Sequence, residues 1–81
     1  MRIEWIDTPK SSNTKRIGYD AEKKALVCDF HRSRMYLYLE VPPEKWEALK
    51  AAPSVGKYLA EWIIPIYSWV YYCEDSEYAA S

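Results

Sequence analysis

The sequence has little of the chemistry on which most enzymes rely. Its 81 residues contain one histidine and two glycines, and no zinc-protease, nucleophile-elbow or glycine-rich phosphate motif occurs in it. His31 falls beside a predicted hairpin turn, where a general base would have neither an orienting partner nor a pocket. We therefore expect no enzymatic activity, no small-molecule substrate, no metal and no cofactor.

Cysteine is also scarce. Cys28 and Cys73 are too few and too widely spaced for a disulfide framework or a four-ligand zinc site. In a chain without an export signal we expect both to be free thiols, Cys28 as a small core residue and Cys73 at the end of the last apolar run. Thiol chemistry at Cys73 is a third function hypothesis, behind the two developed below.

Long apolar runs are missing. No segment approaches the roughly 20 apolar residues that a membrane-spanning helix needs. The first residues lack the charged and apolar regions of a signal peptide. We therefore expect a cytoplasmic protein with no membrane partner.

Charge is nearly balanced, with a formal net charge of −1, but it is unevenly distributed. Residues 1–73 contain all eleven basic residues and nine of the twelve acidic ones, whereas residues 74–81 contain Glu74, Asp75 and Glu77. This division predicts one domain over residues 1–73 and an acidic, frayed tail over residues 74–81.

Aromatic residues are abundant: the chain has four Trp, eight Tyr and one Phe. A domain of this size buries only about 60% of the surface that its unfolded chain exposes. Large side chains packed tightly therefore compensate for a small core.

Alternating apolar residues predict four successive strands, over residues 2–7, 15–19, 25–31 and 34–41. Polar segments separate them. After residue 41 the spacing of apolar residues becomes helical. The first predicted helix starts at Pro42-Pro43 and ends at Pro53. Ser54 is the predicted N-cap of a second helix, whose docked face should consist of Val55, Tyr58, Leu59 and Trp62.

Residues 66–73 are rich in aromatic and β-branched side chains and predict a closing strand. The predicted fold is α+β: a strongly bent antiparallel sheet of about five strands in the order β-β-β-β-α-α-β, with the helical segment before the last strand. An SH3-like or Sm-like small barrel is the alternative architecture.

Both faces of the fourth predicted strand are apolar. Tyr36 and Tyr38 share one face by period-two counting, and Leu37 lies on the other. Such a strand is explained by helices on one face and a second layer, a barrel interior or another subunit on the other. The tyrosines are then either core residues or, if exposed, a stacking platform or an interface.

Six basic residues lie in or beside the connections of the predicted meander. Basic groups that follow phosphates, next to aromatic rings that stack on bases, are what a site for single-stranded nucleic acid requires. A solvated surface explains the same residues, because acidic side chains interrupt them. The candidate nucleic-acid-binding residues are Lys15, Arg16, Lys23, Lys24, Arg32, Arg34, Tyr36 and Tyr38.

The order of short motifs resembles the KTSC domain family, named after the C-terminus of some lysyl-tRNA synthetases and also found as small bacterial proteins. The resemblance covers about residues 11–72. It is carried by Ser11-Ser12-Asn13, Ile17-Gly18-Tyr19-Asp20, Leu26-x-Cys28-x-Phe30, Tyr36-x-Tyr38, Val41-Pro42, Trp46-x-x-Leu49 and Ala52-x-Ser54-x-Gly56-x-Tyr58.

The family is of unknown function, and its attachment to a tRNA synthetase implies RNA binding by association. Members often have a polar residue where this chain has Leu37, which implies that the tyrosines point inward and that Leu37 points outward. We therefore expect a non-enzymatic module that binds RNA or single-stranded nucleic acid. The alternative is a protein-interaction or homo-oligomerisation module with an apolar contact formed by Leu37, Trp69 and Tyr71.

Overall fold

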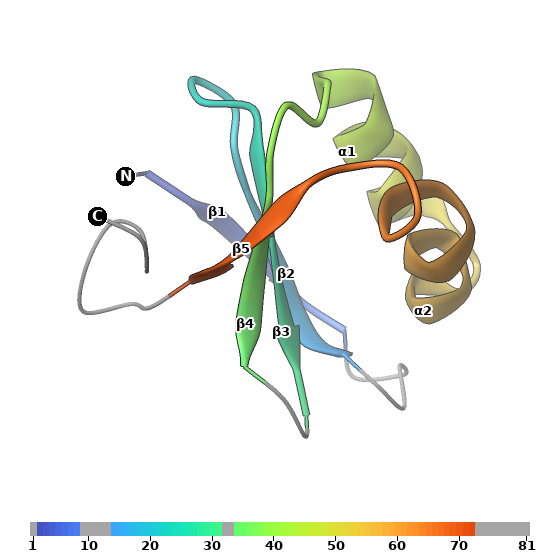
Figure 1. Ribbon diagram of the computed structural model, residues 1–81. Helices are drawn as coiled ribbons and strands as arrows, with labels where there is room; N and C mark the ends of the chain where they lie inside the picture. Colours follow the sequence, from blue (N-terminus) through green and yellow to red (C-terminus); the bar gives the residue numbers. More distant parts are fainter. Residues whose placement is uncertain (1, 9–13, 32–33, 73–81) are drawn as a thin grey trace.

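The computed structural model describes residues 2–8, 14–31 and 34–72 (Figure 1). Its main element is an antiparallel sheet in which the strand order equals the chain order. The strands are β1 (Glu4–Asp7), β2 (Thr14–Asp20), β3 (Ala25–Phe30), β4 (Met35–Tyr38) and β5 (Trp69–Tyr72). The predicted α+β class and the element order are confirmed. The described strands form an open sheet with β1 and β5 as its edges, so the closed-barrel alternative is wrong for them.

Two helices and a π-helical turn cover one face of the sheet (Figure 1). Helix α1 (Pro43–Ala51) has Pro at its first position, Glu44 in its first turn and Lys50 in its last, an arrangement that suits the helix dipole. The Ser54 hydroxyl accepts a hydrogen bond of 3.3 Å from the Lys57 amide and caps α2 (Val55–Tyr58), as predicted.

The main core lies between the sheet and this helical layer. Tyr19 of β2 stacks on Trp46 of α1, with ring centroids 5.4 Å apart and planes 13° apart. The Tyr19 hydroxyl also donates a hydrogen bond to the carbonyl of Val41, so one side chain joins the sheet to the segment that precedes the helix. Cys28 is completely buried in this core, as predicted, and burial raises the pKa of its thiol. Cys73 lies outside the described residues.

A second, smaller core lies on the opposite face of the sheet. Ala25, Val27 and Leu37 form its buried centre. Partly buried side chains from both edges of the sheet pack around that centre: Ile3, Trp5, Met35, Val70 and Tyr72. The bend of the sheet brings these side chains together, which is why both faces of β4 are apolar.

The prediction that Trp62 docks on the sheet is wrong. Trp62 is 49% exposed, whereas the next residue, Ile63, is completely buried. The helix widens into a π-turn, η1 (Leu59–Ile63), in which the Ile64 amide donates to the Leu59 carbonyl five residues earlier. A π-turn rotates the chain less per residue than an α-helix does, so Ile63 takes the inward position.

Several predicted strands are too long, and the fourth and the last differ most from the structure. Strand β4 ends at Tyr38, after which Glu40 has a φ of 56° and the Val41 amide donates to the Lys24 carbonyl. Strand β5 begins at Trp69 because the Tyr67 amide still donates to the Ile63 carbonyl and continues the helical turn. Among the described residues no helix is long and apolar enough to cross a membrane.

Candidate nucleic-acid interface

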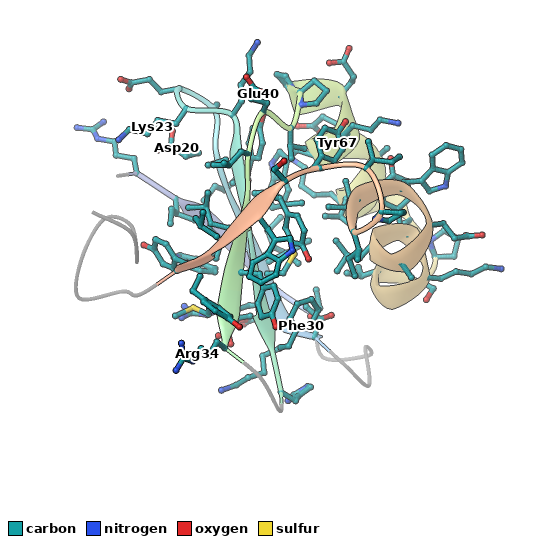
Figure 2. All side chains as sticks on the ribbon, in the orientation of Figure 1. Asp20, Lys23, Phe30, Arg34, Glu40 and Tyr67 are labelled. Atoms are coloured by element: carbon teal, nitrogen blue, oxygen red, sulfur yellow. The ribbon has the colours of Figure 1, made fainter. Side chains whose placement is uncertain are left out.

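The structure divides the predicted basic residues between the two ends of the sheet. Lys23 and Lys24 lie in the turn between β2 and β3, whereas Arg34 lies just before β4 at the opposite end (Figure 2). Antiparallel pairing brings the start of β2, with Lys15 and Arg16, to the same end as Arg34. Arg32 lies outside the described residues. The five described residues therefore do not form one patch.

The turn that holds Lys23 and Lys24 is ordered by an acidic side chain. The Asp20 carboxylate accepts hydrogen bonds from the backbone amides of Glu22, at 3.0 Å, and Lys23, at 3.2 Å. Lys24 has a φ of 54°, which closes the turn. Because the carboxylates of Asp20 and Glu22 lie at the same turn as both lysines, this end of the sheet carries charges of both signs, which does not favour phosphate binding.

Arg16 is engaged within the chain. Its Nε donates to the Asp29 carboxylate at 3.0 Å, and its guanidinium lies 3.9 Å from the centroid of a Trp5 ring. Both contacts are on the side of the second core. Arg16 therefore stabilises the β1–β2–β3 edge, and these contacts make its guanidinium less available to bind an anion.

Tyr38 and Leu37 are core residues. Tyr38 is 2% exposed in the main core, where burial raises the pKa of its hydroxyl. Leu37 is completely buried in the second core beside Val27. The expectation that Leu37 contributes to an exposed contact is therefore wrong, because the bent sheet covers the face that was expected to be open. Tyr38, likewise, has no free ring face for a nucleobase.

Four aromatic rings gather where the helical layer leaves the sheet uncovered. This aromatic cluster consists of Phe30, Tyr36, Trp69 and Tyr71 from β3, β4 and β5. Tyr36 is its centre, with centroid distances of 5.6 Å to Phe30, 4.6 Å to Trp69 and 5.4 Å to Tyr71. Trp69 and Tyr71 are 43% and 40% exposed, so the outer rings face solvent.

A cation lies directly against the cluster. The Arg34 guanidinium is 4.8 Å from the centroid of the Tyr71 ring. Arg34 is exposed, and Figure 2 shows it at the same end of the sheet as Phe30. Of the predicted residues, the structure thus brings together Arg34, Tyr36, Trp69 and Tyr71. Sequence reasoning missed Phe30, although period-two counting along β3 and the register Cys28–Tyr36 place it beside Tyr36.

The described residues also form an open depression at the opposite end, between β1, the β2–β3 turn and α1. Its volume is about 460 Å³, and Glu4, Asp20, Glu22 and Glu47 line it together with Arg2 and Trp46. Its carboxylates would repel a phosphate. Within the described ranges no three His, Cys, Asp or Glu side chains are placed to hold a metal ion.

These features define a class: a small α+β domain whose five-stranded meander is covered on one face by a helical segment and exposes an aromatic cluster at one end. The chain belongs to the KTSC domain family, whose family model matches residues 10–67. The KTSC domain is a domain of unknown function.

The chain is also similar to two relatives in sequence and to one solved structure in fold. An uncharacterised protein of Stutzerimonas stutzeri is 39% identical over 49 residues, which cover 60% of this chain and 69% of the relative. A Tsukamurella paurometabola protein is 40% identical over 50 residues, covering 62% and 75% respectively. The crystal structure of a KTSC domain protein from Yersinia pestis has a TM-score of 0.83 at 24% identity, covering 89% of this chain and all of that one, so the two share a fold.

Proposed function

We propose that this domain binds single-stranded nucleic acid, and RNA in particular, on the aromatic cluster. The observation that supports this most directly is the Arg34 guanidinium over Tyr71, beside the half-exposed Trp69. An exposed ring face and an adjacent cation are the two parts that a site for an unpaired nucleotide needs.

The geometry of the two outer rings limits the size of the site. Trp69 and Tyr71 have centroids 5.1 Å apart, but their planes are 70° apart. A nucleobase that stacks flat on one ring therefore meets the edge of the other. Each stacked base contributes about 1–3 kcal/mol, so the site should hold one or two nucleotides with modest affinity.

The same geometry favours single strands over duplexes. In a duplex each base face is already covered by its neighbours, and the rings of the cluster would have no free face to contact. Among the described residues, the exposed Lys and Arg side chains at this end are Arg34 and Lys15, and Arg16 is held by Asp29, so we expect the described cations to contribute less than the rings.

The chain offers a matched control for the experiment. Trp62 is exposed to a similar degree as Trp69, but it packs near Tyr58 and Lys45 on the helical layer, outside the cluster. We would titrate the protein with fluorescently labelled single-stranded and duplex RNA at low salt and compare Trp69→Ala with Trp62→Ala.

We expect Trp69→Ala to weaken single-strand binding by about 5- to 150-fold, the range that one stacked base implies, and Trp62→Ala to leave it unchanged. The proposal is wrong if no binding occurs at tens of micromolar protein, or if both variants lose affinity equally.

Self-association is a second candidate, favoured by one observation: the two most exposed rings of the cluster lie on an edge strand. Exposed apolar side chains next to an unpaired strand edge are a common site of contact between copies. Light scattering at high protein concentration tests it, and a strict monomer would exclude it.

A further inference from the structure

We propose that two copies of this chain pair antiparallel through β5, with Val70 of each copy on the two-fold axis. The inference rests on the self-association described above and specifies its partner, strand direction and register. It follows from the charges on the two sheet edges, from the backbone groups that β5 leaves open, and from the alternation of its side chains.

The two edges of the sheet differ in protection. Strand β1 carries exposed Glu4 and Asp7 at its two ends, and charges of this kind hinder the addition of another strand. Strand β5 has no charged residue and no proline between Trp69 and Tyr72. Both edge strands are equally short, but β5 lacks the charged side chains that protect β1, so β5 is the edge better suited to accept another strand.

The hydrogen bonds between β4 and β5 show which backbone groups of β5 face outward. The Leu39 amide donates to the Ser68 carbonyl at 2.9 Å, so these directly opposed residues form a hydrogen-bonded pair. Such pairs alternate along an antiparallel ladder, which makes Leu37–Val70 the next one. The amides and carbonyls of Trp69 and Tyr71 consequently point away from β4, toward the open edge.

Side-chain alternation and the outward backbone groups together select the register of a second copy. A two-fold axis perpendicular to the sheet keeps the helix-covered faces of both copies on the same side, so residues of like face must lie opposite each other. Trp69 and Tyr71 share the face of the aromatic cluster, whereas Val70 packs on the second core, so the axis must pass through one residue of β5. An axis at Val70 pairs Trp69 with Tyr71 of the partner subunit and uses the outward amides and carbonyls of both residues, whereas an axis at Trp69 or Tyr71 would use those of one residue within β5.

This register agrees with the backbone. Trp69 and Tyr71 have the outward amides and carbonyls, so their cross-copy pairs are the hydrogen-bonded ones. Val70 uses its backbone groups within the chain, and its cross-copy pair is the non-hydrogen-bonded kind, in which side chains come closest. If β5 paired with β1 of another copy instead, the resulting pair would still have one unpaired β1 edge and one unpaired β5 edge. It would also bring the carboxylates of β1 close to β5.

The paired arrangement has a consequence for the proposed function. It would place the aromatic clusters of two copies side by side in one continuous sheet, with Trp69 next to Tyr71 of the partner subunit. Because β5 is only four residues long, we expect the dimer to be weak and to form at high protein concentration.

Cysteine cross-linking tests the register. In a Cys73→Ser background, Val70→Cys should give a disulfide-linked dimer on mild oxidation, because the two thiols meet at the axis. Ile66→Cys is the control: its side chain is 56% exposed, but the register pairs it with no copy of itself. We expect Val70→Cys to cross-link at least tenfold faster than Ile66→Cys, and equal rates would overturn the proposal.

A second pair of variants does not depend on a thiol. Tyr71→Ala and Tyr71→Pro both remove the ring, but only Tyr71→Pro also removes the outward amide, which the chain itself leaves unused. By sedimentation equilibrium we expect the Pro variant to dimerise roughly tenfold more weakly than the Ala variant. Equal dimerisation would show that the edge is not paired. A wild-type dimer without preferential Val70→Cys cross-linking would overturn this register while leaving self-association intact.

Discussion

Trp5 lies directly over Gly18, its partner across β1 and β2. A Cβ atom built on Gly18 would be 2.8 Å from Cε3 of Trp5 and would also clash with Cγ2 of Ile3. The indole therefore occupies the space that a side chain on β2 would fill, and it closes the second core at the β1 edge. An aromatic ring that covers a cross-strand glycine in this way also fixes the register of the strand pair.

The first prediction follows from this contact. Gly18→Ala forces Trp5 and Ile3 to move, and we expect it to lower the free energy of unfolding by about 1–3 kcal/mol in chemical denaturation. Gly56→Ala, within α2, is the control and should be neutral or stabilising by up to about 1 kcal/mol, because alanine is the better helix former. A Gly18→Ala variant as stable as the wild type would show that Trp5 does not pack on this glycine.

The second prediction tests whether Leu37 is core or surface. Leu37→Ala should cost about 2–5 kcal/mol of unfolding free energy, because it empties the centre of the second core. Leu39, two residues later, is 37% exposed, and Leu39→Ala should cost less than about 1 kcal/mol. Similar losses for both variants, measured by urea denaturation, would contradict the two-core structure.

The third prediction concerns alkaline pH. Burial raises the pKa of the Tyr38 hydroxyl, and burial together with Glu44 raises that of Tyr19. In the unfolded chain both groups ionise near pH 10, so above that pH the unfolded state loses protons that the folded state retains. The stability contribution is therefore complete below about pH 10 and is lost as the pH rises toward the folded pKa values.

Urea midpoints measured from pH 8 to pH 11.5 should show this decline. The buried Cys28 thiol, whose pKa burial also raises, adds to this decline and is the same in every variant. Tyr38→Phe removes one of the two tyrosine hydroxyls and should reduce the slope above pH 10. Tyr71→Phe, which removes an exposed hydroxyl, serves as its control. A midpoint that stays constant above pH 10 would contradict the burial of these hydroxyls.

The fourth prediction separates the two ends of the sheet. Arg34→Gln removes the cation beside Tyr71 and should weaken single-stranded RNA binding about 3- to 10-fold while reducing the slope of log K against log salt by about one. Lys23→Gln, in the turn at the opposite end, has the same charge change and should have little effect. Equal effects of both variants would point to non-specific attraction rather than to a site at the cluster.

Much of the fold was predictable from local signals. Ser54 acts as the predicted N-cap because a hydroxyl before a helix can satisfy an open amide wherever the helix docks. The meander follows from period-two alternation, because polar turns between strands leave few other pairings. The errors occur where tertiary contacts override the local period. Trp62 points to solvent because a π-turn places Ile63 on the core.

The candidate site was only partly predictable for a similar reason. The sequence shows that Tyr36 and Tyr38 share a face of β4, but not how far along that face the helices extend. Tyr38 is buried in the main core, whereas the Tyr36 ring contacts the rings of Trp69 and Tyr71. Those contacts of Tyr36 depend on the register in which β5 pairs with β4. Basic residues predicted the site less well than aromatic residues did. Successive turns of an antiparallel meander lie at opposite ends of the sheet, so basic residues beside different turns can be far apart.

The sequence by itself determined the class of domain, the order of its elements and its family, because these depend on residue spacing and on turn and cap residues that act locally. Only the tertiary structure decided which aromatic residues are core and which are surface. That choice depends on the bend of the sheet and on the place where the helical layer ends, and both result from packing between residues far apart in the chain. The abundance of aromatic rings compensates for a small core, and the position of Trp69 and Tyr71 on an edge strand leaves these two rings exposed.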